Sequence, residues 1–172
     1  ISTDICTHFY AEGGQLPTWV KPEVLKALER VEKKINKKFG DHKNPLLVSV
    51  RSGARASMPG MMDTILNLGL NDETVLGLAE SSNNPRFAWD SYRRFIQMYS
   101  DVVMGMNSSL LEVTMEDLKA EKNIHNDTDL TTDDLKKLVV KFKDLVKQMT
   151  GQNFPTDPYE QLWGAISAVF RT

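Results

Sequence analysis

Two short apolar runs, separated by a segment rich in glycine and proline, limit what this chain can fold into more than any other feature of its sequence. Residues 46–50 follow Asn44-Pro45, include two valines and are too few for a helix of ordinary length. The second run covers residues 65–70, and residues 51–64 between the runs show neither the helical nor the strand period. The pattern predicts a buried strand, a connecting loop and a second strand.

The region before these runs has the spacing of helices. A short helix is expected over residues 3–12, ending at Gly13-Gly14. Residues 20–39 predict an amphipathic helix that ends near Gly40, because apolar residues recur every three or four positions while Lys and Glu fill the other side. The stripe expected to be buried consists of Val24, Leu28, Val31 and Ile35.

The chain after residue 70 is predicted to be entirely helical, because capping residues mark several helix starts. These starts are Asn71, Asn84 followed by Pro85, Thr114, Thr131 or Thr132, and Asp157 followed by Pro158. The helix from Pro85 is expected to end near Met106. The predicted fold class is therefore α+β and mostly α, with a small β element followed by a helical subdomain.

Composition excludes several classes of protein. The 172 residues carry a net charge of −2, so the electrostatic field of a general nucleic-acid-binding protein is missing. No apolar run reaches the roughly 20 residues that cross a membrane. Cys6 is the single cysteine and cannot form an internal disulfide, which favours a reducing compartment, the cytoplasm or an organelle interior.

Metal ligation and nucleophilic catalysis are disfavoured by residue spacing. His8, His42 and His125 are scattered along the chain, and no two histidines stand four residues apart. A Gly-x-Ser-x-Gly elbow is also missing from the sequence. We therefore expect no metal ligands within this chain.

The loop after the first strand is the candidate for chemistry. Arg51 and Arg55 flank Gly53 at the end of the predicted strand, and Gly60 follows in a Met-rich stretch. A guanidinium held by a strand suits two-point contact with phosphate oxygens, and glycines let backbone N–H groups approach an anion. The hypothesis is anion or phosphate binding; the alternative is a connecting loop whose arginines pair with carboxylates.

Three further arginines lie on the helix predicted from Pro85. Helical rotation places Arg86, Arg93 and Arg94 away from the apolar face, where they would point into a cleft. The alternative is a solvated ladder in which Asp90 pairs with Arg86 and Arg94, each four residues away.

The stretch from residue 48 to 71 also resembles a known family. It contains Val-Ser-Val-Arg-Ser-Gly-Ala-Arg, Met-Pro-Gly-Met-Met-Asp-Thr and Asn-Leu-Gly-Leu-Asn, and is similar to the corresponding stretch of the pyruvate, phosphate dikinases. Residues 9–14, 86–95 and 161–163 resemble the same family, so the likeness covers nearly the whole chain. Phosphoenolpyruvate synthases share the Val-Arg-Ser core without the Met-Pro-Gly-Met-Met-Asp-Thr continuation.

The resemblance implies an activity for the intact protein. Such enzymes bind ATP and require Mg²⁺. They convert ATP, inorganic phosphate and pyruvate to AMP, pyrophosphate and phosphoenolpyruvate, through a phosphohistidine on a swivelling domain. This chain would be part of their ATP-grasp-like nucleotide-binding domain: residues 1–70 in the nucleotide-binding subdomain, 71–155 a helical subdomain, and 156–172 a helix returning to the first. The intact enzyme is expected to be a homodimer.

The resemblance also assigns candidate site residues. Arg51 matches an arginine that contacts the nucleotide phosphates and is the catalytic candidate, Gly60 lies in the matching phosphate-covering loop, and Arg94 matches another arginine of the ATP site. Arg55 and Thr64 are further candidates for nucleotide binding. The family's ATP-binding lysine should precede Ile1 and its acidic metal ligands should follow Thr172, so we expect this chain alone to be inactive.

A different class of function stays open beside this one. The basic segment 21–55 and the acidic segment 109–135 would also suit a non-catalytic helical interaction module that docks a partner domain. The gene's reading frame would separate the two, because the enzyme needs coding sequence on both sides of this segment.

Overall fold

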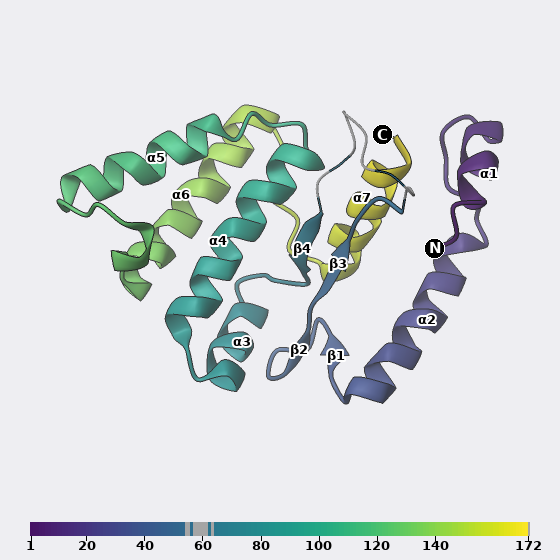
Figure 1. Ribbon diagram of the computed structural model, residues 1–172, viewed down its shortest axis with the longest axis horizontal. Coiled ribbons are helices and arrows are strands. Elements are labelled where there is room, and N and C mark those ends of the chain that lie inside the picture. The colour runs from purple at the N-terminus through teal and green to yellow at the C-terminus, as the bar shows by residue number, and fades with distance from the viewer. Residues whose placement is uncertain (54–55, 57–61, 63, 172) are drawn as a thin grey trace.

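The computed structural model describes residues 1–53, 56, 62 and 64–171 (Figure 1). The helices are α1 (Ile5–Ala11), α2 (Val20–Ile35), α3 (Thr74–Ser82), α4 (Pro85–Val102), α5 (Ser109–Glu121), the 3-10 helix η1 (Asp127–Asp129), α6 (Thr132–Thr150) and α7 (Pro158–Arg171). The strands are β1 (Lys38–Phe39), β2 (Pro45–Leu46), β3 (Val48–Val50) and β4 (Ile65–Leu68). The predicted α+β, mostly α fold is confirmed.

The strands form two small pairs. β3 and β4 are antiparallel, with Val48 opposite Leu68 and Val50 opposite Ile65, which confirms a strand in each of the two apolar runs; most of the predicted loop between them lies outside the described residues. The prediction of a single buried strand over residues 46–50 is wrong, because the chain changes its pairing partner at Leu47. Before Leu47, β2 pairs in parallel with β1; after it, β3 pairs in antiparallel with β4. The valines of β3 are only half-buried.

Helix α2 is shorter than its pattern predicts. It ends at Ile35 because Asn36 adopts the left-handed conformation (φ 57°), and the residues expected to extend the helix pair with β2 instead. Figure 1 shows α2 along the edge of the molecule beside α1. Leu28 is buried, but Val31 and Ile35 are 41% and 52% exposed, so the predicted stripe is buried only in its first half.

Most of the capping residues act as predicted. The side chain of Asn84 accepts from the N–H of Phe87 at 3.0 Å, and Thr131 and Asp134 form a capping box at the start of α6. Thr114 is not a cap: it lies inside α5, where its hydroxyl donates to the carbonyl of Leu110. Helix α4 also ends earlier than expected, at Val102.

Helix α4 lies at the centre of the fold. It packs against α3, α6 and β4, while α7 packs against both β3 and β4 (Figure 1). Its buried face carries Tyr92, Phe95, Ile96 and Tyr99. This packing holds the β3–β4 ribbon between α4 and α7. In the described part of the chain, no helix is long and apolar enough to cross a membrane.

Candidate functional site

Arg51 and Thr64 lie at the same end of the β3–β4 ribbon. Arg51 directly follows β3 and Thr64 directly precedes β4, so both are next to the Val50–Ile65 pair. Ile65 is fully buried, whereas Arg51 is exposed and Thr64 is half-buried.

Arg94 lies on the wall of a hollow beside β4. The hollow has a volume of about 640 Å³ and lies between β4, α4 and the segment from Ser108 to Glu112. Its apolar lining includes Leu66, Phe87, Met98 and Val102. Arg51 and Thr64 are not among its lining residues. The hollow therefore contains Arg94, while Arg51 and Thr64 lie at the end of the ribbon.

The arginines of α4 differ from the sequence prediction. Arg86 donates at 2.8 Å to the carbonyls of Asp127 and Leu130, so it joins no ladder with Asp90. Arg94 does pair with Asp90, through Nε at 3.0 Å, and keeps 66% of its side chain exposed. Arg93 was expected to point outward but is only 5% exposed. The reason is that α4 is covered by other elements around most of its circumference.

The sequence did not predict the pairing of Asp90 with Arg93. Asp90 was considered only as a surface partner of Arg86 and Arg94, whereas its Oδ1 lies 2.5 Å from Nη2 of Arg93. The spacing of three residues between Asp90 and Arg93 allows such a pair on any helix and was the available signal. The burial of this pair depends on tertiary packing, which cannot be predicted from the spacing of the two residues in the sequence.

Arg55 and Gly60 lie outside the described residues, so their roles stay predictions. In the part of the chain that the structure describes, no three His, Cys, Asp or Glu residues lie close enough to hold a metal ion. Within the described residues there is therefore no such cluster to bind a Mg²⁺ that arrives with a nucleotide, and such an ion would need other ligands.

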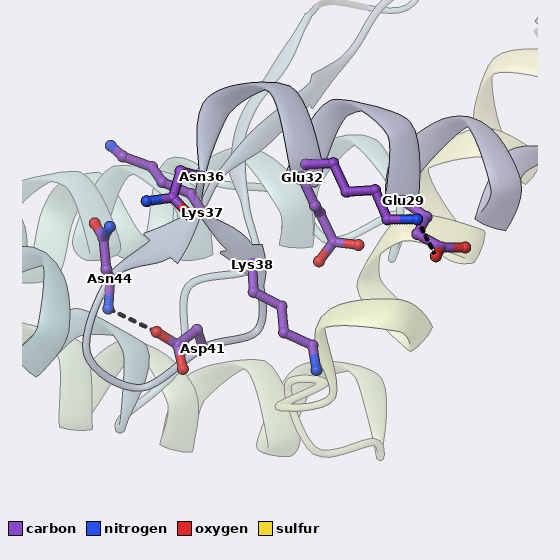
Figure 2. A pocket seen from close by; sticks show the side chains of 8 residues that line it. Glu29, Glu32, Asn36, Lys37, Lys38, Asp41 and Asn44 are labelled. Carbon is purple, nitrogen blue, oxygen red and sulfur yellow. Dashed lines mark hydrogen bonds and ion pairs between the residues drawn. The ribbon is translucent and has the colours of Figure 1, made fainter.

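A second hollow lies between the end of α2 and the loop from β1 to β2 (Figure 2). It has a volume of about 420 Å³, and its charged lining residues are Glu29, Glu32, Lys33, Lys37, Lys38 and Asp41. The N–H of Asn44 donates to Asp41 and holds the pKa of that carboxyl below its usual value. Three carboxylates therefore offset three ammonium groups, and this hollow offers an anion no net positive charge.

The sequence matches the family described as "Pyruvate phosphate dikinase, AMP/ATP-binding domain" over residues 14–107, which is more than half of the chain. The match includes both strands of the ribbon and all of α4. The class defined by this match is a nucleotide-binding domain, and the candidate residues of the ribbon and α4 lie within it.

Curated relatives narrow the class further. The chain is 56% identical to the pyruvate, phosphate dikinase of Clostridium symbiosum over 173 aligned residues, covering 100% of this chain and 20% of that protein. It is 52% identical to the chloroplastic pyruvate, phosphate dikinase of Flaveria pringlei, covering 99% of this chain and 18% of that protein. It is 50% identical to the pyruvate, phosphate dikinase of Entamoeba histolytica, covering 100% of this chain and 19% of that protein. The chain belongs to the pyruvate, phosphate dikinase family and spans about a fifth of the length of these relatives.

Proposed function

We propose that this chain forms one wall of the ATP site in a dikinase that converts ATP, phosphate and pyruvate to AMP, pyrophosphate and phosphoenolpyruvate. The supporting observation is that Arg51 is exposed directly after β3, while Arg94 lines a hollow bounded by β4, the strand that pairs with β3. A guanidinium anchored at the end of a strand is preorganised for phosphate oxygens. The family match to an AMP/ATP-binding domain agrees with this role.

In this proposal Arg51 neutralises charge on the phosphoryl groups as ATP reacts. Phosphoryl transfer depends mainly on positioning and electrostatic stabilisation, which a fixed guanidinium supplies. Arg94 contacts the same phosphates from α4. Gly60 belongs to a loop that covers them, and Arg55 and Thr64 are further contacts. Mg²⁺, when bound, would supply positive charge to the phosphates, and most of its ligands would come from outside this chain.

The other parts that the dikinase reaction requires are proposed to lie elsewhere in a longer protein. They include a lysine that binds ATP, a swivelling domain with the phosphohistidine, and a second subunit in a homodimer. Within this chain, residues 1–70 and 156–172 would form part of the nucleotide-binding subdomain and 71–155 the helical subdomain. The single cysteine suits a reducing compartment, either the cytoplasm or an organelle interior.

The test is Arg51→Ala in an intact dikinase that contains this segment, with ATP-dependent phosphorylation of the histidine as the readout. Losing a preorganised donor should raise the barrier by about 2–4 kcal/mol, which slows the step roughly 30- to 1,000-fold. Arg30→Ala is the matched control, because Arg30 is an exposed arginine of α2 that bonds only within its own helix among the described residues. Phosphorylation at an unchanged rate in Arg51→Ala would overturn the proposal.

A further inference from the structure

Asp90 is held between two arginines on α4. Its Oδ1 accepts a hydrogen bond from Nη2 of Arg93 at 2.5 Å, and its Oδ2 lies 3.0 Å from Nε of Arg94. The side chain of Asp90 is 16% exposed, so little of this carboxylate is left to water. Each carboxylate oxygen therefore has its own guanidinium partner, which fixes the orientation of the group.

Arg93 is an unusual residue for this position. It is only 5% exposed, and its Nε is buried with no hydrogen-bond partner among the described residues. Its Nη1 makes one long contact, 3.5 Å, with Gln97. A buried donor without a partner costs about 1–3 kcal/mol, and a buried arginine needs a carboxylate. Packing alone does not explain an arginine here, because an apolar side chain of similar size would avoid both costs.

Arg94 differs from Arg93 in what it leaves free. Within the described residues its only charged partner is Asp90, which it contacts through Nε, while two-thirds of its side chain is exposed at the hollow. Fixing Nε sets the plane of the guanidinium. The two terminal amino groups are then available for two-point contact with a phosphate.

Charge explains why two arginines share one carboxylate. A lone Asp90–Arg94 pair would be neutral and would attract an anion weakly. The buried charge of Arg93 offsets Asp90, so the three residues together keep a net charge of +1 at the mouth of the hollow.

Two other carboxylates line the hollow. Asp101 accepts from the hydroxyl of Ser108, and Glu112 accepts from the amide of Gln97. Asp101 is seven residues beyond Arg94, which is about 10 Å along a helix. Glu112 is closer to the arginines, because its partner Gln97 also contacts Arg93. An anion bound by Arg94 would therefore lie on the side of that guanidinium away from Gln97 and Asp101.

We propose that Asp90, fixed by buried Arg93, is the positioning residue that holds Arg94 for contact with the phosphates of the nucleotide. This inference rests on the proposed function, because it takes Arg94 as a phosphate ligand. It adds two residues that act through Arg94 rather than on the substrate. Misplacing a binding group by about 1 Å costs as much as 100-fold in rate, so the effect is measurable.

The experiment is a double-mutant cycle in the intact dikinase, with KM for ATP and kcat of histidine phosphorylation as readouts. Asp90→Asn should lower kcat/KM for ATP about 10- to 100-fold, mainly through KM. Once Arg94→Ala is present, Asp90→Asn should have no further effect, because its action passes through Arg94. If the role of Asp90 were purely structural, the fold-losses in kcat/KM from the two substitutions would instead multiply in the double variant.

Controls separate this proposal from the one before it. Asp144→Asn removes an exposed carboxylate from α6 and should leave both parameters unchanged. If Asp90→Asn does not fold, Arg93→Lys keeps the positive charge, loses the planar fork, and should show the same dependence on Arg94. If Arg94→Ala lowers kcat/KM but both positioning variants leave it unchanged, the positioning role is overturned and the proposed function stands. If Arg94→Ala itself has no effect while Arg51→Ala does, Arg94 is not a phosphate ligand and this inference fails alone.

Discussion

The side chain of Gln161 in α7 accepts a hydrogen bond from the N–H of Gly69 at 2.9 Å, across 92 residues of sequence. The same amide donates to the carbonyls of Leu70 and Pro155 at 2.9 and 2.8 Å. Gln161 is fully buried. One side chain thus satisfies three backbone groups and connects α7 to the end of β4.

Gln161→Leu should therefore destabilise the chain strongly. The leucine has a similar size but leaves the backbone groups of Gly69, Leu70 and Pro155 without their partner, and each buried unsatisfied group costs about 1–3 kcal/mol. We expect the free energy of unfolding to fall by about 3–5 kcal/mol, measured by urea denaturation followed by circular dichroism. Gln152→Leu is the control, because Gln152 is exposed and should change the free energy by less than about 0.5 kcal/mol. Equal effects of the two substitutions would contradict this role for Gln161.

The parts of the fold that the sequence predicted well are those set by local contacts. Asn84 caps α4 through the N–H of Phe87, three residues away, and Thr131 and Asp134 form their capping box over the same spacing. The order strand, loop, strand was also predictable, because two apolar runs flank one loop. Each of these features needs only residues that are close in sequence.

The features that the sequence did not predict depend on distant contacts. The change of pairing at Leu47 requires β1 on one side and β4 on the other, and a continuous apolar run contains no sign of it. Helical rotation placed Arg93 away from the apolar face of the helix, yet packing around α4 buries it. For the candidate site, the sequence singled out Arg51, Thr64 and Arg94, but only the pairing of β3 with β4 and the packing of α4 place Arg51 and Thr64 at one end of the ribbon and Arg94 in the hollow beside β4.

Stability should depend on pH through Asp134. Its burial would raise the pKa of the carboxyl, but hydrogen bonds from Lys122 and Thr131 outweigh burial and hold the pKa below 3.8, the value of a free side chain. The unfolded chain then binds a proton more readily, so the stabilisation is present above pH 3.8 and is lost as the pH falls through the folded-state pKa.

Asp134→Asn should remove this dependence. We expect the variant to be less stable than the unaltered chain at pH 7 and pH 5 by similar amounts, with the difference shrinking at pH 3, measured by urea denaturation at each pH. The exposed neighbour Asp133 provides the control. In the Asp133→Asn variant, the free energy of unfolding should fall between pH 5 and pH 3 as it does in the unaltered chain. A difference that stayed constant down to pH 3 would show that the Asp134 carboxylate is not the group responsible.

Gly164 and Tyr99 form a contact that a single methyl group would disrupt. A Cβ at position 164 in α7 would overlap the hydroxyl of Tyr99, which donates to the carbonyl of Gln161 at 3.3 Å. Gly164→Ala should therefore lower the free energy of unfolding by about 1–3 kcal/mol, although alanine favours a helix over glycine by about 1 kcal/mol.

The double variant tests this explanation. Tyr99→Phe removes the overlapping oxygen, and the nearest atoms to the new methyl group are then Cγ1 of Val103 at 3.3 Å and the ring carbon Cζ at 3.4 Å. Gly164→Ala should cost at least about 1 kcal/mol less in the Tyr99→Phe background than alone, because the clash is gone while the helix propensity of alanine remains. Gly77→Ala is the matched control: its Cβ would overlap the backbone carbonyl of His42, so its cost should be the same in both backgrounds. If the cost of Gly164→Ala were unaffected by Tyr99→Phe, the hydroxyl would not be what excludes a side chain at position 164.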